Sequence, residues 1–396
     1  MIVGVLGYRF DYYPYIRNIV DIIPGIEYRK AKDVFSRLNA GARILNRLTG
    51  RELISTFDLN NQFYDFDKNK VDLLHLFNGI SYGHTPWVST FETILPRFRR
   101  LVQGSHGVSP GFAAPWNLSR AFDSLARDPC KHIIAISNCT ANMQRAMLAE
   151  FNSYKESIEK KLVVMHPPQD LTVSQFTDKQ IDMRGQIRFM FVGNAFFRKG
   201  GREVLETLKI LRDTFEYDIQ LTIISSFYVD TYVIKVTPGD IHWATDFMEQ
   251  NKDWIRYFKQ MPNSQVLEKM KDTHIGLLPT YADTYGYSVL EFQAAGCPVI
   301  TTNVRALPEI NDNDRGWIIE VPKNELGEAI YTTKENRFAI STAIRAGLVS
   351  AVQEIFTDRS IIPIKSEQAL SAIKRNHSKE NFAARMKELY LEALNS

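Results

Sequence analysis

Two carboxylates on either side of a helix start are the clearest chemical feature of this sequence. Asp283 and Glu291 are separated by seven residues, and the turn-rich run between them ends in a stretch that predicts a helix N-terminus. Its amides belong to Gly286, Tyr287, Ser288 and Val289. Unpaired amides and aligned peptide dipoles at such a terminus favour a phosphate. Ionised carboxylates accept hydrogen bonds from neutral hydroxyls, so the two acids can bind a sugar hydroxyl and a ribose diol beside that phosphate.

A lysine after another apolar run offers a second group for phosphate. The stretch FVGNAFFRKGG, from Phe191 to Gly201, predicts a strand that ends at Gly193 and a helix that Lys199 and Gly200 open. An ammonium and free amides at the carboxyl end of a strand suit a diphosphate. Taken alone, the same pattern is also that of a surface lysine at a helix start.

These residues need strands and helices that bring them together, and the chain alternates such elements in two series. The first series predicts strands at Ile2–Gly7, Leu73–Phe77, Trp87–Phe91, His132–Ser137 and Leu162–Met165. The second predicts strands at Ile187–Gly193 and Ile219–Ile224, a strand ending at Leu278, and another from Pro298 to Thr302. Alternation of this kind is typical of parallel sheets covered by helices. We expect two doubly wound Rossmann-like α/β domains with a ligand cleft between them.

The polar segment from His166 to Gln186 is the expected linker between these domains. We expect an N-terminal domain at 1–170 and a second domain at 185–372. Residues 373–396 predict a terminal helix that packs back on the N-terminal domain.

Composition limits the function classes. The 396 residues are 44% hydrophobic and 23% charged, which is ordinary for a globular protein of two domains. The three cysteines have neither metal-ligand spacing nor a disulfide framework, and no signal peptide or membrane span is evident, so we expect a cytoplasmic protein. A net charge of +3 without a recognised motif argues against nucleic-acid binding, and no cluster has metal spacing.

Basic residues gather between Arg29 and Arg51. Besides these two arginines, the range contains five Lys or Arg side chains, which are interleaved with apolar ones. They predict a basic amphipathic helix with two interpretations. It lies on an anionic membrane surface, with the protein peripheral at the inner face of the membrane, or it is a solvated helix face.

Taken together, FVGNAFFRKG, the acidic pair and AAGCPVITT resemble the retaining nucleotide-sugar glycosyltransferases of GT-B fold, over roughly Ile187 to Gly316. In that family the first motif holds the donor diphosphate with an arginine and a lysine. Lys199 matches the lysine, Asn194 stands at the arginine position beside Gly193, and Arg198 is the candidate substitute. The resemblance implies that Asp283 faces the donor sugar and Glu291 the ribose. It also implies that the stretch containing Met261 cradles the nucleobase, and that no metal or other cofactor is required.

The resemblance implies that the N-terminal domain supplies the acceptor site and a group near the reacting sugar. Glu92 stands where many relatives carry a histidine, and it is either a polar contact or general base, or a structural residue that caps the next segment. His106, between two glycines of a loop, is the second candidate. Ser137 is expected to cap the helix from Thr140 to Phe151.

The implied function is transfer of a hexose from a nucleoside diphosphate sugar to an acceptor hydroxyl with retention, in glycan or glycoconjugate biosynthesis. A front-face displacement, in which the leaving phosphate helps to deprotonate the acceptor, is the expected mechanism. The acceptor is a glycan, a lipid-linked molecule or a protein. Two alternatives stay open: a GT-B protein that binds nucleotide sugar without transferring it, and an epimerase or phosphorylase of the same fold.

Overall fold

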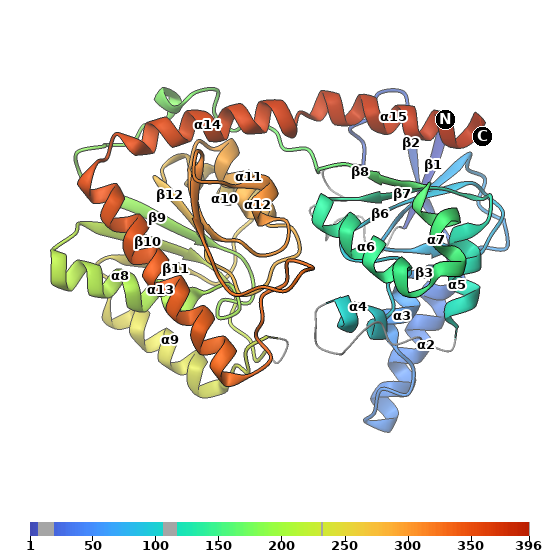
Figure 1. Cartoon of the computed structure of the whole chain (residues 1–396), viewed down its shortest axis with the longest axis horizontal. Coiled ribbons are helices and arrows are strands. Elements are labelled where there is room, and N and C mark those ends of the chain that lie inside the picture. Colours follow the sequence, from blue (N-terminus) through green and yellow to red (C-terminus); the bar gives the residue numbers. More distant parts are fainter. Residues whose placement is uncertain (7–19, 106–116, 231–232, 396) are drawn as a thin grey trace. The chain divides into compact units, whose positions relative to one another are not determined.

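The computed structural model describes residues 1–6, 20–105, 117–230 and 233–395, which form two units (Figure 1). Unit 1 is Met1–Pro168 with Ser378–Ser396, and unit 2 is Gln169–His377. The chain passes between the units twice, and the Gln169 N–H donates to the His377 carbonyl at 2.9 Å where the two passages meet.

The segment expected to be a linker is folded into unit 2 by a buried lysine. The Lys179 ammonium donates to the carbonyls of Ala295, at 2.6 Å, and Met270, at 3.1 Å. It also lies 3.1 Å from the sulfur of Cys297. Because these hydrogen bonds compensate the burial of the charge, residues after Pro168 belong to the second core rather than to a solvated connection.

Unit 1 contains one parallel six-stranded sheet in the order β2-β1-β4-β6-β7-β8, and a pair of short parallel strands, β3 and β5. Its strands are β1 (Ile2–Leu6), β2 (Glu27–Ala31), β3 (Gln62–Phe63), β4 (Leu73–Phe77), β5 (Ile80–Ser81), β6 (Trp87–Phe91), β7 (Cys130–Ala135) and β8 (Leu162–Val164). Its helices are α2 (Val34–Thr49), α3 (Thr56–Asn60), α4 (Arg99–Ser105), α5 (Leu118–Ala126), α6 (Asn138–Glu150), α7 (Asn152–Glu159) and α15 (Lys379–Asn395).

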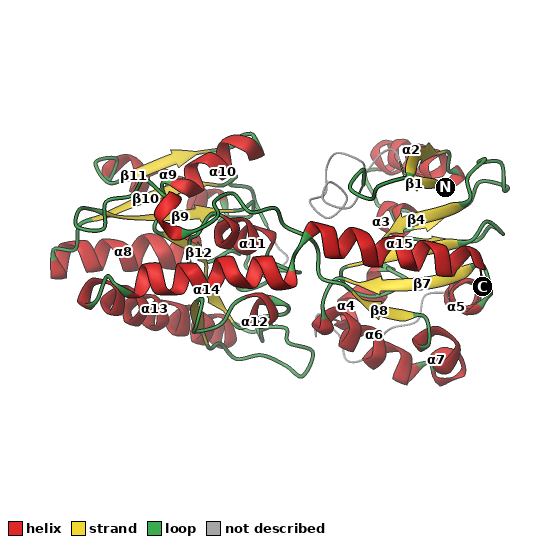
Figure 2. Ribbon diagram, turned by 90° about the horizontal axis from the view of Figure 1, so that it is seen from above, coloured by secondary structure: helices red, strands yellow, loops and turns green. Residues whose placement is uncertain are grey.

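The terminal helix α15 lies across β4, β6 and β7 of unit 1 (Figure 2). His75 of β4 holds it: its Nδ1 lies 2.6 Å from the Tyr390 hydroxyl and its Nε2 lies 2.8 Å from the Thr90 hydroxyl. The structure starts this helix at Lys379, after a break that follows the preceding helix, rather than at residue 373.

Strand β2 was not predicted, because its sequence EYRKA carries three charges and no apolar period. It pairs with β1 at the edge of the sheet, where charged side chains are tolerated. As a consequence the basic helix begins at Val34, with Asp33 as its N-cap, and not at Arg29.

Unit 2 contains a second parallel six-stranded sheet in the order β11-β10-β9-β12-β13-β14. Its strands are β9 (Ile187–Val192), β10 (Ile219–Ile224), β11 (Ile255–Phe258), β12 (Ile275–Leu278), β13 (Val299–Thr302) and β14 (Gly316–Ile319). Its helices are α8 (Gly201–Phe215), α9 (Pro238–Gln250), α10 (Asn263–Lys271), α11 (Tyr287–Ala294), α12 (Leu307–Ile310), α13 (Lys334–Thr357) and α14 (Ile361–Asn376), with a short 3₁₀ turn at Phe176–Asp178.

The two sheets confirm the prediction of two doubly wound α/β halves. In unit 2, α8 packs with α13, whereas α10 and α14 pack with α11, so helices cover both faces of the sheet (Figure 1). The strand order reverses between β9 and β12. In open α/β sheets ligands bind beyond the carboxyl ends of strands at such a switch point, and the loops after these two strands contain Lys199 and Asp283.

Candidate active site at the carboxyl edge of the second sheet

The loops that follow β9 and β12 fit closely together. Gly200 has φ +83°, and a Cβ at this position would lie 2.1 Å from the Pro279 carbonyl oxygen. The Arg198 carbonyl accepts hydrogen bonds from the Tyr281 N–H at 2.9 Å and from the Thr280 hydroxyl at 3.2 Å. The β9–α8 loop, residues 193–200, is therefore fixed against the β12–α11 loop, residues 279–286.

Lys199 and Asp283 form an ion pair across these two loops. Their side chains are 16% and 14% exposed, so both charges are largely removed from water. Burial alone would raise the pKa of Asp283, but the charge of Lys199 and its hydrogen bond outweigh this effect, and the pKa lies below its ordinary value. Asp283 is thus an ionised acceptor at neutral pH.

Arg198 adds a second positive charge to the same place. Its guanidinium lies 3.5 Å from Asp230, and its charge also contributes to the lowered pKa of Asp283. Asn194 is turned to a different partner, since its Oδ1 accepts from the Ser226 hydroxyl at 2.9 Å. Gly193, with φ +147°, leaves room for the stem of Lys199, which would lie 3.5 Å from a Cβ there.

The N-terminus of α11 closes the edge beside Asp283. Gly286 is its N-cap with φ +93°, and a Cβ there would lie 2.5 Å from Leu307. Its first turn contains Tyr287, Ser288 and Val289, and Val289 donates its N–H to the Gly286 carbonyl at 2.8 Å. Among the described residues, no side chain caps this helix. The first turn of a helix suits an oxyanion, because the aligned peptide dipoles place partial positive charge at the N-terminus.

Glu291 lies one turn further along α11 and is held by a neighbour that sequence reasoning missed. The Asn263 amide donates to its Oε1 at 2.9 Å. Asn263 starts α10, directly after the loop that contains Met261, so the predicted nucleobase stretch and the predicted ribose ligand belong to one cluster. A polar residue after Pro262 at a helix start was the only sequence signal for it.

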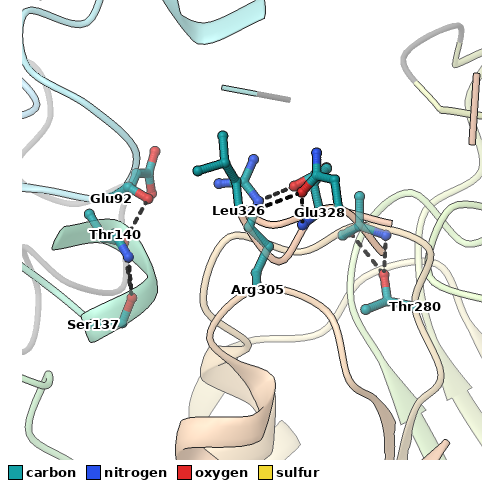
Figure 3. Close-up of polar contacts among 9 residues, drawn as sticks. Glu92, Ser137, Thr140, Thr280, Arg305, Leu326 and Glu328 are labelled. Atoms are coloured by element: carbon teal, nitrogen blue, oxygen red, sulfur yellow. Dashed lines mark hydrogen bonds and ion pairs between the residues drawn. The ribbon is translucent and has the colours of Figure 1, made fainter. Parts of the chain in front are cut away.

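A buried ion pair that was also missed fixes the next loops. Arg305 and Glu328 are 4% and 1% exposed and pair with each other (Figure 3). Arg305 has φ +52°, and its N–H donates to the Gly327 carbonyl at 2.8 Å. Burial raises the pKa of Glu328 even though Arg305 opposes the shift. The two residues are 23 positions apart in the sequence, so their spacing does not predict that they pair.

Glu92, at the carboxyl end of β6, is engaged within unit 1. Its Oε1 accepts from Arg97 at 2.7 Å and from the Asn78 amide at 3.4 Å, and its N–H donates to the Asn78 Oδ1 at 3.0 Å. Its backbone carbonyl accepts from the Thr140 hydroxyl at 3.2 Å (Figure 3). The geometry gives Glu92 a bracing role in this loop. His106 lies outside the described residues.

Ser137 is the N-cap of α6, as predicted. Its hydroxyl accepts from the Thr140 N–H at 3.0 Å, which satisfies one amide of the first helical turn (Figure 3).

Unit 1 contains a cavity of about 970 Å³ between α2, α3, α4 and α5. Arginine, acidic and apolar side chains line it, among them Arg99, Arg100, Arg120, Glu52, Asp58, Leu53 and Ile54. Arg99 pairs with Glu52, and Arg120 lies 4.6 Å from the centre of the Tyr82 ring. Cationic and apolar groups together suit an amphipathic anionic ligand.

Over the ranges that the structure describes, there is no group of three or more His, Cys, Asp or Glu side chains able to hold a metal ion. Among the helices described, none is long and apolar enough to cross a bilayer.

Residues 175–345, which contain the β9–α8 loop and all of α11, match the family described as glycosyl transferases group 1. The matched segment is less than half of the chain, and it contains the motifs on which the resemblance rests. The resemblance noted in the sequence is confirmed.

Two curated relatives match this chain over part of their length. A 41.2 kDa uncharacterized protein in the cps region of Klebsiella pneumoniae is 24% identical over 178 residues, which are 41% of this chain and 45% of that protein. The O-antigen chain mannosyltransferase B of Escherichia coli is 24% identical over 121 residues, 31% of this chain and 30% of that protein. The chain therefore spans less than half of either relative's length.

Solved structures agree over nearly the whole chain. A glycosyltransferase from Rickettsia africae ESF-5 has a TM-score of 0.60 and 15% identity, covering 100% of this chain and 98% of that one. Anabaena HepE, solved in complex with UDP and glucose, has a TM-score of 0.52 and 11% identity, covering 92% and 85%. At these identities the likeness concerns the fold, and it confirms the GT-B architecture.

Proposed function

We propose that this protein transfers a hexose from a nucleoside diphosphate sugar to an acceptor hydroxyl, with retention at the anomeric carbon. The observation that carries the proposal is the Lys199–Asp283 ion pair at the switch point of the second sheet, beside the first turn of α11. A cation and a set of amides there suit the diphosphate of such a donor, and an ionised carboxylate suits its sugar hydroxyls.

The diphosphate leaving group is the part that most needs stabilisation. In this proposal it accepts hydrogen bonds from the α11 amides and from Lys199, and Arg198 supplies the second positive charge that the family's arginine supplies elsewhere. The loops that carry these charges are bonded to each other, so once Lys199 has turned from Asp283 to the bound diphosphate, no further reorganisation is needed as the leaving group forms.

The two carboxylates have separate tasks. Asp283 is ionised and accepts from a hydroxyl of the donor sugar, while Lys199 moves toward the incoming diphosphate. Glu291, oriented by Asn263, accepts from the ribose diol. Met261 lies in the loop before Asn263 and contacts the base.

The retaining course is the one that the resemblance to this family implies. We propose a front-face displacement in which an oxygen of the departing phosphate takes the proton of the acceptor hydroxyl as the new glycosidic bond forms. The C–O bond to the diphosphate breaks on the same face, so charge and proton both leave with the diphosphate. This course needs no protein nucleophile.

The product is a glycan or glycoconjugate in our proposal. One relative is by its name an O-antigen mannosyltransferase, and another is encoded in a cps region. HepE was solved with UDP and glucose, which fits a nucleoside diphosphate hexose as donor. We place the acceptor in unit 1, at the cavity lined by Arg99, Arg100 and Arg120.

The test is donor turnover without an acceptor. Purified protein is incubated with a panel of UDP-, GDP- and ADP-hexoses, and release of the nucleoside diphosphate is followed by chromatography. We expect slow hydrolysis of at least one donor, absent from the Lys199→Ala variant. Hydrolysis of none, together with failure of every donor to bind, would contradict the proposal.

A donor-binding protein without transferase activity is the second candidate. The engagement of Glu92 with Arg97 and Asn78 favours it, because this residue stands where relatives carry a histidine. That candidate predicts donor binding with no hydrolysis and no transfer, so the same incubation separates the two.

A further inference from the structure

Helix α2 contacts its own unit through a polar face. Asn39 is buried, and its amide donates to the Thr56 carbonyl and to the Asn60 side chain, both at 2.7 Å. One level further along the same face, the Asn46 amide donates to the Ile54 carbonyl at 2.8 Å. The Asn46 Oδ1 accepts from the Leu53 N–H at 2.8 Å. These hydrogen bonds, together with the buried Ala42 and the contact of Phe35 with Tyr82, fix this helix to the fold.

The apolar side chains of α2 point the other way. Leu38, Ile44, Leu45 and Leu48 are all exposed, with Leu48 at 80% and Ile44 at 62%. At 3.6 residues per turn they form one continuous stripe, on the side of the helix away from Asn39 and Asn46. An amphipathic surface helix ordinarily buries its leucines against its own core, whereas this helix exposes them to solvent.

Exposed arginines border the stripe. Arg37, Arg43 and Arg47 all lie on α2, Arg51 follows it, and no Asp or Glu occurs from residue 34 to residue 51. Of the two acids that flank this range, Asp33 caps the helix and Glu52 is paired with Arg99. A stripe of leucines with only positive charges beside it is complementary to a surface that is apolar within and anionic outside.

Two more exposed apolar side chains extend this face toward the cavity of unit 1. Leu53 and Ile54 follow α2 directly and also line that cavity, together with Arg99 and Arg100. Figure 1 shows that the C-terminal half of α2 projects beyond the neighbouring helices of unit 1. A flat surface can therefore reach the stripe.

We infer that the face formed by α2 and residues 51–54 docks on an anionic lipid bilayer, with its leucines at the acyl boundary and its arginines among the head groups. Docking itself is independent of catalysis. Its consequence for the acceptor rests on the proposed function: the cavity beside the face would receive an acceptor that is itself carried by the membrane. A second copy of the chain fits the face less well, because its own arginines would meet like charges.

The test is co-sedimentation of the full-length chain with vesicles. Vesicles of phosphatidylcholine alone are compared with vesicles that contain about one third phosphatidylglycerol, and the double variant Leu45→Ser/Leu48→Ser is compared with the wild type. Ile364→Ser is the matched control, because Ile364 is 60% exposed on α14 of unit 2. We expect binding to anionic vesicles that falls at least tenfold in the double variant and is unchanged in the control.

Charge gives an independent arm. Arg43→Gln/Arg47→Gln should weaken binding to the anionic vesicles by roughly 25-fold, since each arginine near such a surface contributes about fivefold. Binding that is absent in the wild type, or that survives in the leucine variant, would overturn the inference. So would a leucine variant that turns a dimer into a monomer while vesicle binding is absent.

Donor hydrolysis in solution distinguishes failure of this inference from failure of the proposed function. The leucine variant should keep wild-type hydrolysis, because its substitutions are on α2 of unit 1, whereas Lys199 and Asp283 belong to unit 2. Loss of vesicle binding with hydrolysis intact supports the inference, whereas vesicle binding in a protein that hydrolyses no donor overturns only the proposed function.

Discussion

Two ion pairs stand at the carboxyl ends of strands, one in each unit, and their surroundings differ. Lys199–Asp283 in unit 2 and Arg97–Glu92 in unit 1 are buried to the same extent, between 14% and 16% exposed. Around Glu92, the Asn78 side chain bonds both its carboxylate and its N–H, and the Thr140 hydroxyl bonds its carbonyl. Beside Asp283 lie an uncapped helix N-terminus and a second cation.

The comparison shows that a largely buried ion pair does not by itself identify an active site. In unit 1 the pair completes a local network, so its removal should affect the loop more than a ligand. In unit 2, by our proposal, phosphate and hydroxyl groups of the donor compete for both partners. The neighbouring groups, rather than burial, distinguish a binding site from a structural brace.

The largest expected effect is that of Lys199→Ala on turnover. Loss of this cation should lower kcat/KM at least 100-fold, or about 2.7 kcal/mol of transition-state stabilisation, because the leaving diphosphate loses its fixed charge. Arg97→Ala, which breaks the matched pair in unit 1, should change kcat/KM by less than tenfold. Steady-state kinetics measures the effect of both variants, with circular dichroism as a folding control. Equal losses of kcat/KM would contradict the distinction between a binding site in unit 2 and a structural pair in unit 1.

Acid should act on unit 1 through His75. Burial lowers the pKa of His75 from 6.5 to about 3, so the folded state keeps it neutral while the unfolded chain binds a proton below 6.5. The free energy of unfolding should therefore fall as pH drops from about 6.5 toward 3, by up to about 1.4 kcal/mol per pH unit from this residue. Urea unfolding of the wild type and His75→Phe at pH 7.5, 5.5 and 4.5 tests this.

His274 in unit 2 also contributes to the pH dependence of stability, because burial lowers its pKa to about 4. His75→Phe should be less stable at pH 7.5, having lost the contacts with Tyr390 and Thr90, but should show the smaller pH slope. A variant whose slope equals that of the wild type would show that His75 is not the group that responds.

Glu291→Gln should raise the KM for the donor about tenfold and change kcat little, because it weakens the hydrogen bonds to a part of the donor that does not react. Asn263→Ala should shift KM in the same direction by a smaller factor, since it only orients the carboxylate. A change confined to kcat would contradict the assignment to ribose.

The smallest expected effect is that of Glu92→Gln. If this carboxylate braces the loop, the variant should keep kcat within threefold and lose about 1 kcal/mol of unfolding free energy, because the amide keeps part of the bonding to Arg97 and Asn78. A hundredfold loss of kcat at unchanged stability would make Glu92 a general base instead and break the contrast between the two pairs.

Much of the fold was predictable because apolar runs mark the buried strands of parallel sheets. The predicted runs at Ile187–Gly193, Ile219–Ile224 and Leu73–Phe77 coincide with β9, β10 and β4. Strand β2 was not predictable, since its EYRKA sequence is specified by pairing with β1 and not by its own period. The aromatic insertion from Phe227 to Arg256 contains α9, whose start at Thr237 and Pro238 has a helix-capping pattern.

At the site, residues that follow strands directly were predictable, because the carboxyl ends of parallel strands meet at one edge. Lys199 and Asp283 are in this class, and the structure joins them in one ion pair. Asn263 and the pair of Arg305 with Glu328 were not, because their positions depend on the packing of loops far apart in sequence. Contacts between such distant loops leave no periodic pattern in the sequence, so they could not be predicted from it.

The most direct test of the central claim, that the carboxyl edge of unit 2 binds a nucleoside diphosphate sugar, is thermal unfolding in the presence of UDP, GDP and ADP. A ligand at 100 times its Kd adds about 2.7 kcal/mol to the free energy of unfolding, so it raises Tm by several degrees. We expect at least one nucleoside diphosphate to raise the Tm of the wild type and to have little effect on Lys199→Ala. No rise with any of the three, or an equal rise in both proteins, would contradict the account.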